Sequence, residues 1–329
     1  MTNPYPSERK DRGAWILRHR PERLPVDVRR PHTFFVEQER SASGEIVDVA
    51  TLFLTNRECP WRCVMCDLWR HTVTEALPPG VIPQQVDYAL QQMALSPPAR
   101  PLRQIKLYNS GSFFDAGAIP RADYRAIGRR IHSFERVIVE SHPALIGPAV
   151  LAFREVLPSP SVLEVALGLE TAHPEVLAKL NKGVTLEQFA HAAAFLRDHE
   201  IALRVFILVQ PPFMAESEAL VWTERSLNFA FDRGATVATL IPTRAGNGSL
   251  EALAHQGLFA PPRLSMLEAA LKYGIELRRG RVLADLWDLE KFSDCAACFA
   301  ARRDRLREMN LRQSVPPAIE CGRCVAVTR

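Results

Sequence analysis

The stretch Glu58–Trp69, "ECPWRCVMCDLW", spaces Cys59, Cys63 and Cys66 as C-x3-C-x2-C. It directly follows "VDVATLFLT" (47–55), a segment rich in β-branched and aromatic residues that is predicted to be a strand. Three thiols crowded at the end of a strand indicate metal or cluster ligands before they indicate disulfides. The stretch therefore predicts a metal-dependent site at one edge of a sheet.

Beyond this loop, strand patterns and helical patterns alternate six times. The predicted strands lie in 47–55, 103–115, 135–143, 161–171, 202–212 and 235–243, and the predicted helices in 82–95, 120–134, 144–157, 185–200, 216–234 and 261–277. Such alternation predicts an α/β fold with a parallel sheet and crossover helices. Six units are too few for a closed eight-stranded barrel, so we expect a partial (βα)6 barrel with its site at the carboxyl ends of the strands.

Composition and hydropathy are those of an ordinary globular protein. Apolar residues make up 47% of the 329 residues and charged residues 24%. No apolar run is long enough to span a membrane, and the first residues are polar and basic with no apolar signal core. We therefore expect a cytoplasmic location without membrane contact, where thiols stay reduced.

Both ends of the chain are mildly basic. Residues 1–32 hold eight Lys and Arg against four Asp and Glu, and residues 278–329 hold eleven against seven. A phosphate-rich partner would favour this distribution, and a solvated Arg-rich surface would produce it equally well. The charge alone does not choose between the two.

Four further cysteines lie near the carboxyl end. Cys295 and Cys298 form one C-x2-C pair and Cys321 and Cys324 form another, which is the spacing of a closed four-thiolate metal site. Zinc is the first choice for this site and an auxiliary iron–sulfur cluster is the alternative. The predicted organisation is an N-terminal basic extension (1–46), the partial barrel (47–280) and a C-terminal metal-binding appendage (281–329).

The three cysteines of the loop allow two interpretations from their spacing. His71 could complete a zinc site with three thiolates. A [4Fe–4S] cluster is instead held by the three thiolates alone, which leaves one iron with a vacant position. A metal with a vacant position is reactive, so the second interpretation predicts an enzyme.

With these residues, the loop resembles that of the radical S-adenosylmethionine (radical SAM) enzymes. The resemblance implies that Cys59, Cys63 and Cys66 hold a [4Fe–4S] cluster whose open iron binds S-adenosylmethionine. It also implies a six-unit partial barrel and a reducing electron donor of the flavodoxin or ferredoxin type. Reductive cleavage of the cofactor would give a 5′-deoxyadenosyl radical that abstracts hydrogen from the substrate.

Other strand ends carry the remaining candidate site residues. Asn109, Ser110, Gly111 and Ser112 resemble the turn that receives the cofactor's amino group in this family. Glu140 and Glu170 follow buried strands, where a carboxylate is costly without a partner, and the resemblance implies contacts to the cofactor ribose or the substrate. We expect Trp69 to pack under the loop rather than on the adenine.

Three longer stretches narrow the resemblance to a branch of the family. "LYNSGSFFD", "VESHPALI" and "GLETAHPEVLAKLNKGVT" resemble the radical domain of the elongator acetyltransferase and, more closely, the archaeosine-synthase radical subunit group. The second group implies a 7-deazaguanine-type nucleoside in tRNA as substrate, and a partner subunit. Alternatives are the same radical chemistry on a small metabolite or peptide, and a non-catalytic iron–sulfur electron carrier.

Overall fold

A computed structural model describes residues 4–96, 98 and 100–324, so residues 1–3 and 325–329 of the two predicted end segments lie outside it. One mixed sheet runs through the described residues in the order β1-β2-β3-β4-β5-β6-β7-β8. Its strands are β1 (Thr33–Arg40), β2 (Ile46–Leu54), β3 (Leu102–Asn109), β4 (Arg136–Ser141), β5 (Val162–Glu170), β6 (Ala202–Val209), β7 (Ala235–Pro242) and β8 (Arg281–Ala284). β1 pairs antiparallel with β2, and all later neighbours are parallel.

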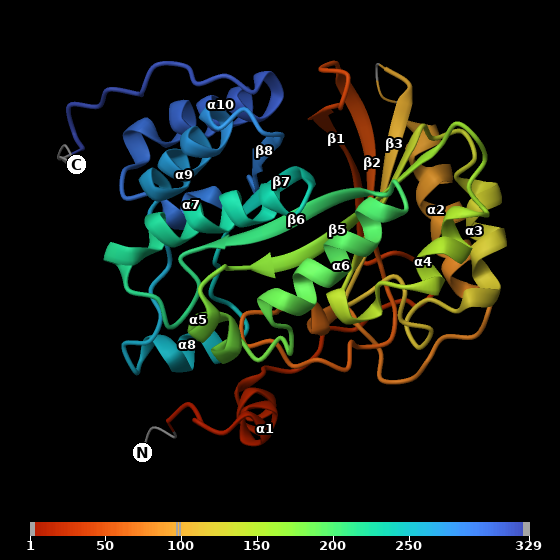
Figure 1. The fold of residues 1–329 in the computed structure, drawn as a ribbon, viewed down its shortest axis with the longest axis horizontal. Helices are drawn as coiled ribbons and strands as arrows, with labels where there is room; N and C mark the ends of the chain where they lie inside the picture. Colours follow the sequence, from red (N-terminus) through yellow and green to blue (C-terminus); the bar gives the residue numbers. More distant parts are fainter. Residues whose placement is uncertain (1–3, 97, 99, 325–329) are drawn as a thin grey trace.

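Helices follow most strands and cover the outer face of the curved sheet. They are α1 (Arg9–His19), α2 (Val81–Leu95), α3 (Tyr124–Arg130), α4 (Pro148–Arg154), α5 (Pro174–Lys179), α6 (Leu186–Asp198), α7 (Glu216–Asp232), α8 (Ser249–Ala254), α9 (Leu264–Glu276) and α10 (Ala296–Arg312), with short 3-10 helices at Leu68–His71, Arg121–Asp123, Pro143–Leu145 and Leu289–Phe292. In Figure 1, α2, α3 and α4 group on one flank, and α7, α9 and α10 on the other.

The six predicted strand–helix units are present as β2 to β7 with their helices, so the predicted partial barrel is confirmed. Two further strands, β1 and β8, extend it at its edges. β1 lies within the residues assigned to the N-terminal extension, and β8 within those assigned to the C-terminal appendage. The domain boundaries stay a prediction, since one continuous sheet crosses both of them.

The side chains of the strands alternate between the helices and the lumen of the half-barrel. Leu107, Val139 and Leu167 face the helices and are fully buried in the main apolar core. The alternate positions point inward, as the two-residue period of a strand requires. The lumen therefore has its own lining, which differs in character along the strands.

Buried charges form one layer of this lumen. Arg204 on β6 lies 2.6 Å from Glu164 and 2.5 Å from Glu39, measured between side-chain nitrogen and oxygen atoms. Lys106 Nζ lies 2.6 Å from Glu39 Oε2. Burial opposes ionisation of Glu39, but the charges of Arg204 and Lys106 outweigh it and lower the pKa of this carboxyl. This network links β1, β3, β5 and β6: Glu164 and Arg204 lie near the start of their parallel strands, and Glu39 lies near the end of the antiparallel β1.

Aromatic and small residues form the next layer. Tyr108, Ile138 and Ala166 make a separate apolar cluster inside the lumen, with Phe53 and Phe206 packed against it. Beyond this layer, at the carboxyl ends of the strands, lie Ser110, Glu140 and Gly168. The fold thus places polar strand ends above an aromatic layer and a charged floor.

Candidate functional site

The three cysteines of the loop open into one large cavity. Its volume is about 1130 Å³, and it extends from the loop into the lumen of the half-barrel. Cys59, Cys63 and Cys66 all line it, as do Ser110, Gly111, Glu140, His142, Glu170 and Lys182 from other strand ends. The structure therefore brings the predicted loop and both predicted carboxylates together.

The three cysteines are half-buried and lie close to cations. Burial raises the pKa of each of the thiols of Cys59, Cys63 and Cys66 to about 12, and Lys182 opposes this shift at Cys59 and Cys63. A thiol this weakly acidic ionises when a metal binds it, since the thiolate is the ligand. The donor set therefore fits a metal cluster better than it fits free reactive thiols.

Gly111 leaves room beside the first of these thiols. A Cβ atom at this position would lie 2.6 Å from Cys59 Cβ and 3.2 Å from Cys59 Sγ, and the backbone φ of Gly111 is +123°. Only glycine adopts this conformation readily, and only glycine avoids this clash. Asn56 holds the turn in place, since its Oδ1 accepts the Ser110 N–H at 3.2 Å. The residues present thus fit a cluster at the loop.

Contacts from distant segments hold the backbone of the loop. Asn247 Nδ2 donates to the carbonyl of Val64 at 2.8 Å and to that of Cys66 at 3.2 Å. Asn181 Nδ2 donates to the carbonyl of Arg62 at 2.7 Å. Asn181 lies in the stretch GLETAHPEVLAKLNKGVT that carries the resemblance, and Asn247 lies four residues after the strand predicted at 235–243; the sequence singled out neither residue.

Glu58 gathers three guanidinium groups immediately before the loop. Arg20 lies 2.7 Å away and Arg62 3.0 Å away, and Arg23 also pairs with this carboxylate. The Arg20 guanidinium also lies over the ring of Trp69, 4.5 Å from its centroid. A net positive shell suits the negative charge that three thiolates bring to an iron–sulfur cluster. Sequence patterns did not reveal this shell, because Arg20 and Arg23 are separated from Glu58 by more than thirty residues.

The two predicted carboxylates have different surroundings. Glu140 Oε1 accepts the Asn109 backbone N–H at 2.5 Å. Burial raises the pKa of Glu140 to about 8, against the lowering effects of that hydrogen bond and of Lys182. Glu170 pairs with Lys182 Nζ at 2.6 Å, and its backbone φ is +65°. Both carboxylates face the cavity, where they can accept hydrogen bonds from a ligand.

The predicted turn divides between the cavity and the sheet. Ser110 and Gly111 line the cavity. Ser112 Oγ instead bonds Ser141 Oγ at 2.8 Å. The amide side chain of Asn109 is buried without a hydrogen-bond partner among the described residues, and its backbone N–H serves Glu140. The assignment of these four residues to the cofactor stays a prediction.

The histidine and tryptophan side chains of the site are occupied by ring stacking and hydrogen bonds within the protein. Trp61 stacks on His142, with ring centroids 3.7 Å apart, and His142 Nε2 lies 3.1 Å from the Lys182 carbonyl oxygen. Trp69 is buried, as expected, and donates to the Cys66 carbonyl at 3.1 Å. His71 stacks on His32 with centroids 3.4 Å apart, which gives no support to a zinc site that includes His71.

The four tail cysteines converge. Their sulfur atoms all lie within 4.8 Å of one another, with 3.9 Å between Cys295 and Cys321 and 3.4 Å between Cys298 and Cys324. Sulfurs at the corners of a tetrahedral zinc site are about 3.8 Å apart, given Zn–S bonds of about 2.3 Å. Cys295 is the N-cap of α10, and backbone N–H groups of Cys298 and Ala297 lower its pKa to about 7. The geometry is that of a closed four-thiolate metal site.

The basic helix α10 uses two of its arginines inside the molecule. Arg302 lies 2.6 Å from Glu268 on α9, and Arg305 donates to the carbonyls of Pro316 and Pro317. These two side chains stabilise the tail and are not free to contact phosphates.

No described helix is long and apolar enough to cross a membrane.

Sequence comparisons identify two informative relatives, and no family model matches the chain. The archaeosine synthase subunit beta of Methanosarcina acetivorans is 27% identical over 68% of this chain and 65% of that protein. An uncharacterized protein of Methanocaldococcus jannaschii is 24% identical over 78% of this chain and 72% of its own length. The match thus covers slightly less than two thirds of the relative that has a named activity.

Two solved structures share the fold. Elp3 of Methanocaldococcus infernus superposes with a TM-score of 0.53 and 14% identity, covering 72% of this chain and 62% of that one. Methylornithine synthase superposes with a TM-score of 0.53 and 14% identity, covering 83% and 73%. The chain therefore shares the half-barrel fold of these two proteins, which is the fold that the predicted resemblance implied. Together with the synthase relative, this supports the prediction of a radical SAM enzyme.

Proposed function

We propose that this chain binds a [4Fe–4S] cluster through Cys59, Cys63 and Cys66 and uses S-adenosylmethionine to abstract hydrogen from a 7-deazaguanine-type nucleoside in tRNA. The observation that carries the proposal is the convergence of three half-buried cysteines, Gly111 and two carboxyl groups on one cavity. The relative named archaeosine synthase subunit beta supports the tRNA substrate and a partner subunit. The proposal includes a reducing electron donor of the flavodoxin or ferredoxin type and, because the site needs reduced thiols, a cytoplasmic location.

When bound, the cluster and S-adenosylmethionine would supply an organic radical produced by reductive cleavage. The chain's own residues would orient the cofactor and the substrate and shield them from water. Gly111 presents a surface without a side chain beside Cys59, and Glu140 and Glu170 offer carboxyl oxygens to the cofactor's ammonium and hydroxyl groups or to the substrate. Lys182 pairs with Glu170 in a buried setting, where an unpaired charge would be costly.

We assign zinc to Cys295, Cys298, Cys321 and Cys324, where it would act as a structural ion. A closed four-thiolate set has no position left for a substrate. An auxiliary iron–sulfur cluster is the alternative at these residues, and metal analysis separates the two.

An anaerobic assay tests the proposed function. The protein is reconstituted, iron and zinc are counted per chain, and 5′-deoxyadenosine is measured after dithionite and S-adenosylmethionine are added. We expect about four irons, about one zinc and formation of the product. Cys63→Ala is the matched variant and should lose iron and product while keeping zinc. Product formation by Cys63→Ala would contradict the cluster assignment.

A second assay tests the substrate. tRNA that carries a lysine adduct on a 7-deazaguanine base is incubated with the reconstituted enzyme, and its nucleosides are analysed by mass spectrometry. We expect loss of the adduct, by hydrogen abstraction and C–N cleavage, in step with 5′-deoxyadenosine. Cofactor cleavage with an unchanged adduct would reject tRNA of this type and favour a small metabolite or peptide.

A further inference from the structure

A series of aromatic rings runs from the lumen to the open edge of the half-barrel. Tyr108 contacts Phe206 and Phe53, with ring centroids 5.9 and 5.7 Å apart. Phe53 continues to Trp287 at 6.2 Å and to Phe35 at 6.3 Å, and Phe35 and Trp287 are 5.3 Å apart. All five side chains line the cavity that also contains the cysteine loop. The cavity therefore has one wall of aromatic rings.

The outermost ring of this wall is held in place yet left open. Trp287 is 52% exposed, although burying a tryptophan would stabilise the fold. Its backbone N–H donates to Asp285 Oδ1 at 3.1 Å, and its carbonyl accepts from Arg244 Nη2 at 2.6 Å. Asp288, the next residue, adopts a left-handed φ of +50° that ends the turn. A fixed backbone with an exposed ring is suited to contact a ligand.

The two edges of the sheet contribute matching pairs of side chains. On β1, Phe35 and Glu37 are two residues apart and share the inward face. Directly after β8, Asp285 and Trp287 are also two residues apart and line the same cavity. β1 and β8 are the two edge strands of the sheet, and the part of the cavity between them is called the gap below. A ring and a carboxylate thus border this gap on each side.

Both carboxylates line the cavity and pair with a cation, while Asp285 also accepts the Trp287 N–H and Glu37 also accepts the Thr51 hydroxyl. Asp285 Oδ2 lies 2.8 Å from Arg244 Nη1, and Glu37 Oε1 lies 2.9 Å from Lys106 Nζ. Burial, with a contribution from the neighbouring Glu37, raises the pKa of Asp285 against the effect of Arg244. Ionised carboxylates only accept hydrogen bonds, so a ligand that meets them should present N–H or O–H donors.

The inner end of the aromatic wall, at Tyr108, lies near the cysteine loop. Tyr108 and Ser110 are successive inward-facing residues of β3 and its end, and such residues are about 7 Å apart along a strand. Ser110 adjoins Gly111, which contacts Cys59. Tyr108 therefore lies one strand step from the cysteine loop, and Phe53 connects Tyr108 to Trp287 and Phe35 at the other end of the aromatic wall.

We propose that the gap between β1 and β8 binds a flat nitrogen heterocycle, stacked on Trp287 and Phe35 with its N–H edge toward Glu37 and Asp285. A guanine-type ring has this shape and presents adjacent N–H donors. The assignment of this heterocycle as the part of the substrate that reacts rests on the proposed function. The binding site itself rests on the rings and carboxylates alone.

Binding of guanosine to the reconstituted protein with S-adenosylmethionine tests this site, measured by anaerobic equilibrium dialysis. We expect Trp287→Ala to weaken guanosine binding about tenfold and Trp287→Phe to retain most of it, since stacking depends on the ring. Inosine, which lacks the exocyclic amino group, should bind more weakly than guanosine. Trp222→Ala on α7 is the matched control, because Trp222 packs outside this cavity against His173, and it should bind as wild type does.

Two results would overturn the proposal: no guanosine binding to the wild type, or equal binding by Trp287→Ala and the wild type. Equal affinity for inosine and guanosine would overturn the role of the carboxylates. The cofactor assay keeps the two proposals apart. Cofactor cleavage without guanosine binding rejects this site and leaves the radical function standing. Guanosine binding that depends on Trp287, without cofactor cleavage, supports this site and rejects the radical function.

Discussion

Two glycines at the site lie against groups that an added side chain would displace. Gly111 adjoins Cys59, as described above. Gly168 faces the pair formed by Glu170 and Lys182, and a Cβ there would collide with Glu170 Oε1 and Lys182 Nζ. In both places a side chain would displace a group that the proposed chemistry needs. Such glycines mark a site as clearly as its charged residues do.

Replacing Gly111 with alanine should therefore damage the cluster site. The added Cβ collides with Cys59 and must adopt an unfavourable φ, so we expect Gly111→Ala to retain less than half of the wild-type iron and to lose about 1–3 kcal/mol of unfolding free energy. Iron analysis and urea denaturation measure the two effects. Gly13→Ala in α1 is the matched control, since nothing lies within 4 Å of its Cβ position. Full iron content in Gly111→Ala would contradict the proposed contact.

Glu140 should make stability depend on pH. Its pKa is about 8 in the folded chain, against 4.5 as the ordinary value, so the folded state holds this proton more tightly. Raising the pH from about 4.5 toward 8 should thus destabilise the wild type by up to about 1.4 kcal/mol per pH unit relative to Glu140→Gln. Urea denaturation of both proteins without added cofactor, at pH 5, 6, 7 and 8, measures this. Parallel pH curves would show that Glu140 ionises normally.

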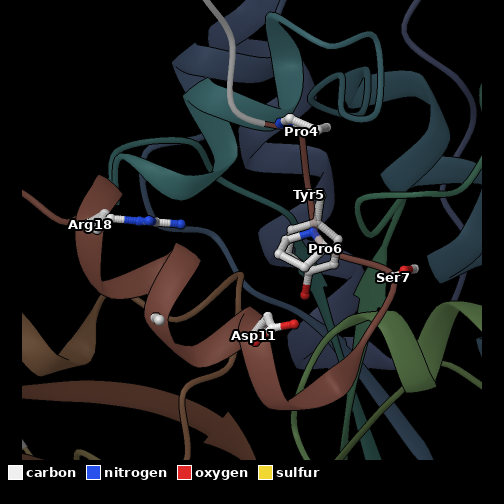
Figure 2. Close-up of a pocket in the computed structure, with 7 residues that line it drawn as sticks. Pro4, Tyr5, Pro6, Ser7, Asp11 and Arg18 are labelled. Atoms are coloured by element: carbon white, nitrogen blue, oxygen red, sulfur yellow. The ribbon is translucent and has the colours of Figure 1, made fainter.

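At the scale of elements, α1 supports the cysteine loop from below. Trp15 and Ile16 are fully buried in an apolar cluster with Val64 of the loop and Leu180. The start of the chain leads into this helix through Tyr5, whose ring lies 5.0 Å from that of Trp15. Figure 2 shows the cavity between this leading segment and α1, lined by Tyr5, Asp11 and Arg18 among others. The N-terminal region thus forms part of the foundation of the site.

Trp15→Ala should consequently affect the loop as well as the helix. We expect a loss of about 3–5 kcal/mol of unfolding free energy, because a fully buried ring is removed. We also expect lower iron retention, since Val64, which stands between Cys63 and Cys66 in the chain, loses Trp15 as a packing partner. Leu17→Ala on the same helix is the control, because Leu17 is 50% exposed and should change stability by less than about 0.5 kcal/mol. If Trp15→Ala loses stability but keeps all its iron, α1 does not support the loop.

At the scale of the whole molecule, the tail links both edges of the sheet. Arg40 Nη1 on β1 donates to the Leu311 carbonyl at 3.3 Å. Asn310 Nδ2 and Gln313 Nε2 donate to the carbonyls of Ala284 and Val282 on β8, each at 2.8 Å. α10 is anchored at its other end by the four cysteines. The proposed zinc site therefore helps to fix the positions of β1 and β8, the two strands that border the gap.

Removing one tail cysteine should separate stability from the proposed radical chemistry. We expect Cys298→Ala to lose zinc and about 2 kcal/mol or more of unfolding free energy, because Cys298 is buried and three thiolates cannot close the site. Iron at the cysteine loop should be unchanged. Metal analysis and thermal melting check this, with Cys63→Ala as the reciprocal control. Loss of iron with retained zinc would show that the tail does not act as a separate metal site.

Patterns in the sequence predicted six of the eight strands but missed the two at the edges. β1 alternates Phe35, Glu37 and Glu39 toward the lumen, so its inward face is largely charged and lacks the apolar signal of a strand. β8 has only four residues, from Arg281 to Ala284. Both become strands through pairing with neighbours, and local propensity does not contain that information.

Local patterns were enough to predict the alternating α/β fold, the cysteine loop and the paired tail cysteines, because strand and helix periods and ligand spacings are local properties. Only the tertiary structure showed that Glu58 gathers Arg20 and Arg23, that Lys182 neutralises Glu170, and that Trp287 meets Phe35 across the gap. Trp287 and Phe35 stand 252 positions apart in the chain. Their contact arises when the curved sheet brings its first and last strands near each other, and no short sequence pattern encodes that closure.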